Sequence, residues 1–199
     1  MNTFIKLTLL GAFSISVLNA KDVLKDKSPD GKFALQIHHG EEGWEAAIIN
    51  LRSGGEETNL DVYQTNYVEG MGLTWSKDST RVAYFEPDRR GGTTHIYFRK
   101  GAEFEEIDFP EIDLRELDRA GKTGGEEVLG KTVGSVERPM KWLKSGSLVI
   151  RIDETYLNEY EKLSKSSYRS KIIVIGFDTN HKASVRSITD PASGEKKPR

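Results

Sequence analysis

The sequence contains no cysteine, which excludes disulfides, thiolate metal sites and cysteine nucleophiles. It also lacks an excess of either charge, since 29 Lys and Arg stand against 31 Asp and Glu. This balance gives no electrostatic reason to expect nucleic acid as a partner. A chain of 199 residues buries roughly 70% of its unfolded surface when it folds, so a core can form without cross-links.

Patterns that carry catalysis are also scarce. No Gly-x-Ser-x-Gly nucleophile motif occurs, and no two of the four histidines have metal-ligand spacing on one face; they are His38, His39, His95 and His181. Residues 125–132 match the GxxxxGK[ST] phosphate loop, but their polar, glycine-rich flanks provide neither the preceding strand nor the following helix. We interpret that match as chance. We therefore expect no catalytic residue, no cofactor and no metal.

A long hydrophobic run occurs only at the N-terminus. Lys6 precedes the apolar stretch Leu7–Leu18, and the small residue Ala20 precedes a polar segment, as in a secretory signal peptide. About 12 apolar residues are too few to cross a membrane, which needs about 20. We expect a signal peptide at 1–20, a single β-rich domain at 21–189 in the periplasm or outside the cell, and a disordered polar tail at 190–199.

Three segments repeat one pattern, a tight polar turn followed by an apolar strand. They begin 48 and then 67 residues apart and are Lys27–Ile37 (KSPDGKFALQI), Trp75–Phe85 (WSKDSTRVAYF) and Trp142–Ile152 (WLKSGSLVIRI). In the first copy Pro29, Asp30 and Gly31 are residues that favour a chain reversal. The aligned Trp75 and Trp142 are expected in the core.

Alternating apolar residues around each copy predict a meander of about four short strands. In the middle copy the expected strands are 71–75, 81–86, 94–99 and 104–109. Lys171–Phe177 (KIIVIGF) is apolar on both faces and so needs cover on both sides. We predict an all-β fold of about three four-stranded antiparallel units, propeller-like or stacked as sheets, with one or two short helical insertions.

The segments SPDGKFAL and WSKDSTRVAYF resemble the TolB-type, WD-repeat-like β-propeller unit of bacterial envelope proteins. The resemblance covers residues 22–190 and implies a propeller-like binding scaffold. Propellers typically close with four to eight blades, whereas this chain supplies three. Closure would therefore require a second copy or strands from a partner; otherwise the units form an open stack.

Two insertions interrupt the repeats. Residues 110–131 begin with a predicted short helix from Pro110 to Gly121, and the rest is glycine-rich. Residues 154–168 place Tyr156, Tyr160 and Leu163 at helical spacing. This stripe either packs on the sheet as core or protrudes for recognition, since tyrosine is a favoured interface anchor.

Arg89 and Arg90 lie in a predicted turn, either solvated or pairing with carboxylates of a partner. Together with Tyr156 and Tyr160 they are the candidate binding residues. The leading hypothesis is an exported, non-enzymatic protein that binds another protein, or itself, through loops of the scaffold. The alternatives are a hydrolase of envelope polysaccharide or peptide, and a binder of sugars or small ligands that uses Trp44 or the tyrosines.

Overall fold

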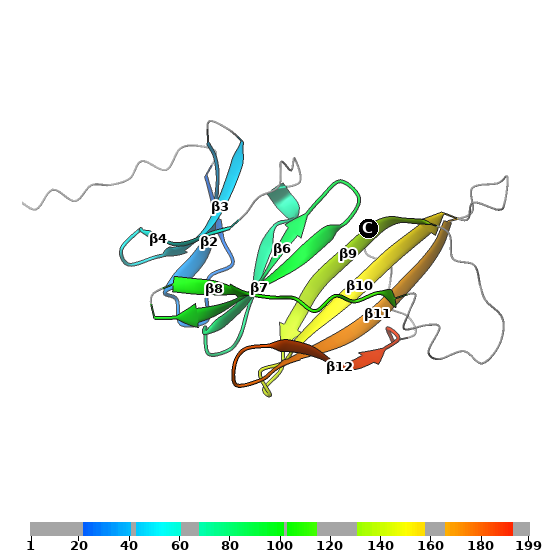
Figure 1. Ribbon diagram of the computed structural model, residues 1–199. Coiled ribbons are helices and arrows are strands. Elements are labelled where there is room, and N and C mark those ends of the chain that lie inside the picture. The colour runs from blue at the N-terminus through cyan, green and yellow to red at the C-terminus, as the bar shows by residue number, and fades with distance from the viewer. Residues whose placement is uncertain are drawn as a thin grey trace, which may run out of the picture.

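The computed structural model describes residues 22–40, 43–60, 68–101, 103–114, 131–157 and 166–192. The described chain is almost entirely β, arranged as three consecutive four-stranded antiparallel meanders (Figure 1). This arrangement confirms the predicted all-β fold of three units. Among these residues, no helix is both long enough and apolar enough to span a lipid bilayer.

Each unit takes its strands from one continuous stretch of sequence. Unit 1 contains β1 (Val23–Lys25), β2 (Phe33–His39), β3 (Trp44–Asn50) and β4 (Glu56–Leu60). Unit 2 follows the 3-10 turn η1 (Val68–Gly70) and contains β5 (Gly72–Trp75), β6 (Arg81–Pro87), β7 (Gly92–Lys100) and β8 (Glu103–Ile107). Unit 3 contains β9 (Lys131–Trp142), β10 (Leu148–Leu157), β11 (Ser166–Phe177) and β12 (Ala183–Thr189).

Unit 1 is a sheet of its own, whereas units 2 and 3 join at one point. A single parallel bridge between Gly92 of β7 and Val136 of β9 links their strands into an eight-stranded sheet. Glycine is required at the neighbouring position 91, because a Cβ there would lie 1.6 Å from the Ser135 carbonyl oxygen. The backbones of the two units can approach this closely only without that side chain.

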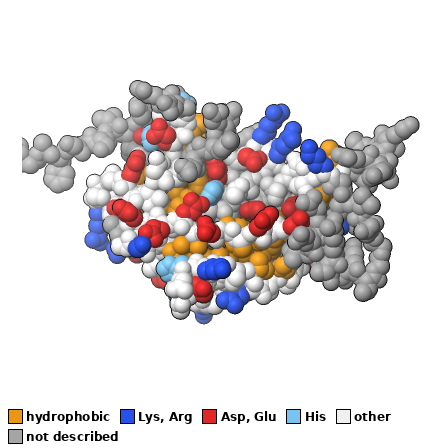
Figure 2. Space-filling view, in the orientation of Figure 1, with side chains coloured by type: hydrophobic (Ala, Val, Ile, Leu, Met, Phe, Trp, Pro, Cys, Tyr) orange, Lys and Arg blue, Asp and Glu red, His pale blue; other side chains and the backbone are white. Residues whose placement is uncertain are grey.

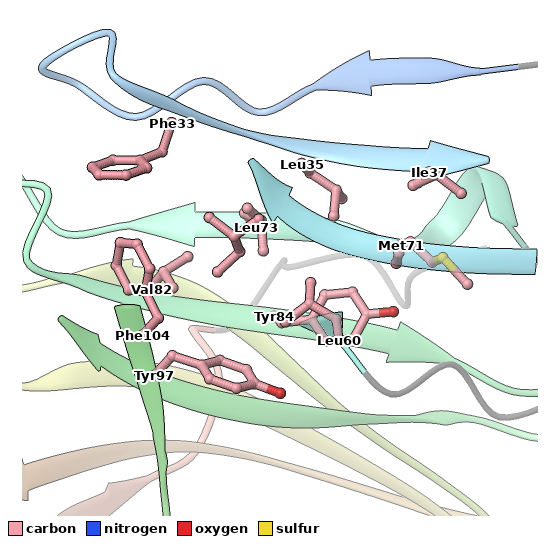
Figure 3. Packing of buried hydrophobic residues seen from close by; sticks show 12 residues of the cluster. Phe33, Leu35, Ile37, Leu60, Met71, Leu73, Val82, Tyr84, Tyr97 and Phe104 are labelled. Atoms are coloured by element: carbon pink, nitrogen blue, oxygen red, sulfur yellow. The ribbon is translucent and has the colours of Figure 1, made fainter. Parts of the chain in front are cut away.

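Unit 2 buries both of its faces because side chains alternate along each strand. Val82 and Tyr84 of β6 point into a core shared with unit 1, where they meet Leu35 of β2 (Figure 3). Ala83 of β6 instead belongs to a second core shared with unit 3, which includes Ile150. The units are therefore stacked face to face, with a layer of apolar side chains between each pair.

The helical prediction for residues 154–168 is wrong wherever the structure describes them. Residues up to Leu157 continue β10, and those from Ser166 onward form β11, which pairs with β10 over ten residue pairs. The hydrogen bonds of this long hairpin satisfy the backbone that a helix would have satisfied internally. The helix predicted from Pro110 does not begin there, because residues 110–113 have no regular secondary structure. Leu114 is helical and buried in the second core, and the rest of the predicted helix lies outside the described residues.

The strand β9 was not predicted. The sequence predicts no strand between the insertion at 110–131 and the third repeat, yet Lys131–Trp142 forms a twelve-residue strand paired along β10. Lys131 and Thr132, the end of the apparent phosphate loop, open this strand. A phosphate loop leads into a helix, so the structure agrees with the interpretation of that match as chance.

Candidate functional site

The repeated turns all lie at one edge of the stacked units, toward the lower left of Figure 1. We call this edge the turn rim. It consists of the β1–β2, β5–β6, β9–β10 and β11–β12 turns, at residues 28–32, 76–80, 143–147 and 178–182. The opposite rim carries the β2–β3 and β6–β7 hairpins.

The first two turns share one hydrogen-bond pattern. In the first, the Ser28 hydroxyl accepts from the amide of Phe33 at 3.0 Å and donates to the carboxylate of Asp30 at 2.7 Å. In the second, the Ser76 hydroxyl accepts from the amide of Arg81 at 2.9 Å and donates to Asp78 at 2.6 Å. The serine and aspartate of each copy therefore stabilise the reversal that the sequence predicted.

These bonds also change the acidity of the carboxyls. The hydrogen bond from Ser76, aided by Thr80 and the charge of Arg81, lowers the pKa of Asp78 against the opposing effect of burial. Burial also acts to raise the pKa of Asp30, but hydrogen bonds from Ser28 and Lys32 outweigh it and lower the value. Both side chains remain anionic and hold their turns at neutral pH.

Neighbouring turns on the rim are bonded to one another. The amide of Asp30 in the first turn donates to the hydroxyl of Ser79 in the second, at 3.0 Å. The Arg81 guanidinium after the second turn donates through Nη1 to the carbonyl of Gly146 in the third, at 2.8 Å. The rim is thus a continuous surface supported by the rigid sheets beneath it, which is a common setting for binding residues.

A cavity of about 350 Å³ opens on the turn rim between units 2 and 3. Its walls are mostly polar and come from strands and turns distant in sequence. The lining residues are Arg81, Phe98, Ser145, Gly146, Ser147, Gly176, Phe177, Asp178, Thr179, His181 and Arg186. Figure 2 shows basic side chains over β12, beside this rim. A cavity with convergent polar groups on a rigid scaffold is the strongest candidate site in the described chain.

Two arginines of the cavity lie across glycines. A Cβ on Gly146 would lie 1.9 Å from Nη1 of Arg81, and one on Gly176 would lie 2.3 Å from Nε of Arg186. Gly146 also has a φ of +83°, which favours glycine. These two positions therefore leave the space that the guanidinium groups occupy. Arg81 in addition stacks over the ring of Phe98, with its Cζ 5.1 Å from the ring centroid.

Neither arginine forms an ion pair with a carboxylate among the described residues. Arg81 donates to Gly146, and its remaining donors have no acceptor among the described residues. The one acidic residue of the cavity, Asp178, is engaged by its own turn, accepting from the amides of Asn180 at 2.8 Å and Lys182 at 2.9 Å. The cavity therefore presents two guanidinium groups with unused donors.

The structure places the sequence-predicted binding residues away from this cavity. Arg89 and Arg90 are exposed at the tip of the β6–β7 hairpin on the opposite rim. Tyr156 lies near that same rim in β10, but it is fully buried and donates its hydroxyl to Glu154. Tyr160 lies outside the described residues. Burial leaves Tyr156 no surface with which to contact a partner.

Sequence reasoning missed Arg81, Arg186 and the two glycines. The turn that contains Gly146 lies in the predicted turn-and-strand segment Trp142–Ile152, but no local pattern connects it to Arg81, which lies 65 residues away. Trp44, the predicted stacking platform for sugars, packs against the first core and the ring of His39. Trp75 and Trp142 are also partly buried against the two cores, as expected.

A second group of ionisable side chains lies between the units, away from the cavity. Burial, together with the nearby charge of Glu154, raises the pKa of Glu137, while Thr94 and His95 act in the opposite direction. On the other face of unit 2, Nδ1 of His95 lies 2.8 Å from Glu106. Within the described residues, no three His, Asp or Glu side chains are placed to hold a metal ion.

No protein-family model matches the sequence, and no curated protein matches it. Among solved structures, TolB from Acinetobacter baumannii is similar to it with 9% sequence identity and a TM-score of 0.36. The match covers 87% of this chain and 42% of TolB, so the chain spans less than half of that protein's length. At this level of similarity the comparison assigns neither an activity nor a role to any residue of the cavity.

Proposed function

We propose that this chain is a non-enzymatic binding protein that engages another protein through the turn rim. The observation that carries the proposal is the cavity whose two arginines form no ion pair with a carboxylate within the described chain. An arginine with unused donors on a rigid surface is well suited to an interface, where arginine is enriched among the residues that dominate binding.

The construction of the rim supports this proposal. Bonds from Asp30 to Ser79 and from Arg81 to Gly146 fix adjacent turns relative to one another before any partner arrives. A surface that is already ordered loses less conformational entropy on association than a mobile loop does. The site is also built from several turns, so a partner would contact units 2 and 3 together.

Export is part of the proposal and rests on the sequence alone. The charged start, the apolar stretch and Ala20 favour cleavage of residues 1–20 and a position in the periplasm or outside the cell. Intact-mass measurement of the chain purified from its own host tests this part. Loss of the first 20 residues supports export, and a full-length mass with Met1 retained argues against it.

Site-specific photocrosslinking in the native host tests the protein-binding role. A photoreactive phenylalanine analogue replaces Ser145 or Thr179 on the turn rim, and Arg89 on the opposite rim serves as the matched control. We expect the same partner, identified by mass spectrometry, to be crosslinked from Ser145 and Thr179 but not from Arg89. Adducts from Arg89 alone would place the interface on the opposite rim, and the absence of adducts from all three would refute the binding role.

A further inference from the structure

We infer that the cavity of the turn rim is a carboxylate-binding site in which Arg81 and Arg186 hold the bound group. The inference rests on the proposed function and deepens it, because it names the chemical group that the partner inserts. That group is the side chain of an aspartate or glutamate, or the C-terminal carboxylate of the partner.

The geometry of the two arginines carries the argument. Both guanidinium groups line one cavity, and each lies across a glycine whose missing side chain leaves room for it. The planar fork of a guanidinium matches the two oxygens of a carboxylate and can form paired hydrogen bonds with them. Ser145, Ser147 and Thr179 add hydroxyl groups around the same space.

The charge of the lining favours a monoanion. The two guanidinium groups and the Asp178 carboxylate of the lining sum to one positive charge, which one bound carboxylate balances. Asp78, whose pKa is lowered by the hydrogen bond from Ser76 and also by the charge of Arg81, lies outside the lining. The Asp178 carboxylate itself accepts from two backbone amides of its turn, which keeps it in place beside the arginines. A phosphate carries about two negative charges at neutral pH and would leave the site with an excess.

The backbone of the cavity points the same way. Phosphate sites commonly use a concave array of free backbone amides. Here the turn amides are already bonded within the turns, as for Gly146 to Leu143, Ser147 to Ser145 and His181 to Asp178. The side-chain guanidinium groups are therefore the main anion donors, and each planar fork can pair with both oxygens of a carboxylate.

Titrations followed by amide NMR test the inference on the purified mature chain. One probe is a tripeptide with a single glutamate side chain and both ends blocked; the other is a trialanine with only its C-terminal carboxylate free. The glutamine analogue of the first probe and inorganic phosphate are the comparison ligands. We expect millimolar or tighter binding of at least one carboxylate probe, with shifts in Ser145, Gly146 and Thr179.

Variants connect that binding to the arginines. Arg186→Gln should weaken carboxylate binding by about tenfold, the effect of losing a hydrogen bond to a charged group. Arg186→Lys, which keeps the charge but loses the planar fork, should retain part of it. Arg89→Gln removes one positive charge from the opposite rim and should leave the affinity unchanged. Arg186 is exposed, so its variants should fold, whereas Arg81→Gln also loses the bond to Gly146.

Stronger binding of the glutamate peptide assigns the site to an acidic side chain, and stronger binding of the trialanine assigns it to a C-terminus. The inference would be overturned if neither carboxylate probe bound, or if the glutamine analogue bound as well as the glutamate peptide. It would also be overturned if phosphate bound more tightly than the carboxylate probes, or if Arg89→Gln weakened carboxylate binding as much as Arg186→Gln does. The isolated chain suffices for this test. Carboxylate binding without any crosslinked protein would refute the proposed function alone, and crosslinks without carboxylate binding would refute this inference alone.

Discussion

The indole N–H of Trp142 donates to the backbone carbonyl of Thr74 in the preceding unit, at 2.8 Å. Trp75 makes the equivalent bond to the carbonyl of Asp26, one unit further back, at 2.6 Å. Asp26 and Thr74 occupy matching positions, directly before the first residue of each aligned repeat. The same bond therefore joins each unit to its predecessor, which explains why tryptophan recurs at this position.

The first prediction concerns this bond. Trp142→Phe keeps an aromatic ring in the second core but leaves the carbonyl of Thr74 without its donor. We expect the free energy of unfolding, measured with urea, to fall by about 1–3 kcal/mol. Trp44→Phe is the control, because Trp44 packs against the first core and its indole forms no hydrogen bond with the described residues, so this change should cost less. Equal losses would show that only packing matters at Trp142.

The second prediction concerns Ser79, which occupies the position of Gly31 in the first repeat. Its φ of +58° is unfavourable for serine, yet its hydroxyl accepts the amide of Asp30 at 3.0 Å. Ser79→Ala keeps the strain and loses the bond, so it should destabilise by about 1–2 kcal/mol. Ser79→Gly loses the same bond but relieves the strain, so urea unfolding should place it nearer to wild type. The reverse order would mean that the backbone at Ser79 is not strained.

The third prediction concerns how the free energy of unfolding falls at acid pH. The folded pKa of Asp78 lies below its ordinary value of 3.8, so the unfolded chain binds more protons between the two values. The stability that this carboxylate contributes is present above the unfolded pKa and is lost as pH falls through the folded pKa. We expect Asp78→Asn to cost stability at pH 7 and to lose less than wild type on acidification. Urea unfolding at several pH values checks this. An equal loss of stability on acidification in Asp78→Asn and wild type would contradict this assignment.

The fourth prediction concerns Glu137, whose pKa shifts in the opposite direction to that of Asp78. Burial and the charge of Glu154 raise the folded pKa of Glu137 above its ordinary value of 4.5. Its contribution is present below the unfolded pKa and is lost as pH rises through the folded pKa. Glu137→Gln should therefore be more stable than wild type at pH 7 and similar to it below about pH 4. Thermal unfolding at both pH values checks this, and a variant that is less stable at pH 7 would contradict it.

The fifth prediction tests the glycine beneath Arg186. Gly176→Ala places a Cβ where Nε of Arg186 lies, so this flexible side chain must leave its position over the strand. We expect weaker binding of the carboxylate peptide, whereas unfolding should change by less than about 0.5 kcal/mol because alanine suits a strand better than glycine. Gly55→Ala is a control, since the nearest atom to its Cβ is 3.5 Å away. Unchanged peptide affinity in Gly176→Ala would show that Arg186 does not need this position.

Local patterns predicted much of the fold because turns and strands leave local signals. The strands expected at 81–86 and 94–99 fall within β6 and β7, and the Ser28 and Ser76 turns form as their residues indicate. The failures occurred where pairing over a distance decided the outcome. The helical spacing of Tyr156 and Tyr160 was overridden at Tyr156 by the pairing of β10 with its neighbours on both sides.

The candidate site was accessible to sequence reasoning only in fragments. The local sequence predicts the turn that contains Ser145 and Gly146. Arg81 and Arg186, however, reach the cavity from strands that are far apart in the chain. Arg89 and Arg90, predicted as binding residues because arginines in a turn can pair with carboxylates, lie on the opposite rim. Adjacent arginines can be recognised from the sequence alone, whereas the residues that line a cavity depend on which strands are adjacent in space.

The sequence by itself determined that this protein is all-β and that its repeated turns each begin a buried strand, because turn preferences and side-chain alternation act over a few residues. Only the tertiary structure decided that units 2 and 3 join at Gly92 and Val136 and that Arg81 and Arg186, each lying over a glycine, line one cavity. Stacking of the units set these relations, since burying apolar faces against one another fixes which distant residues become neighbours.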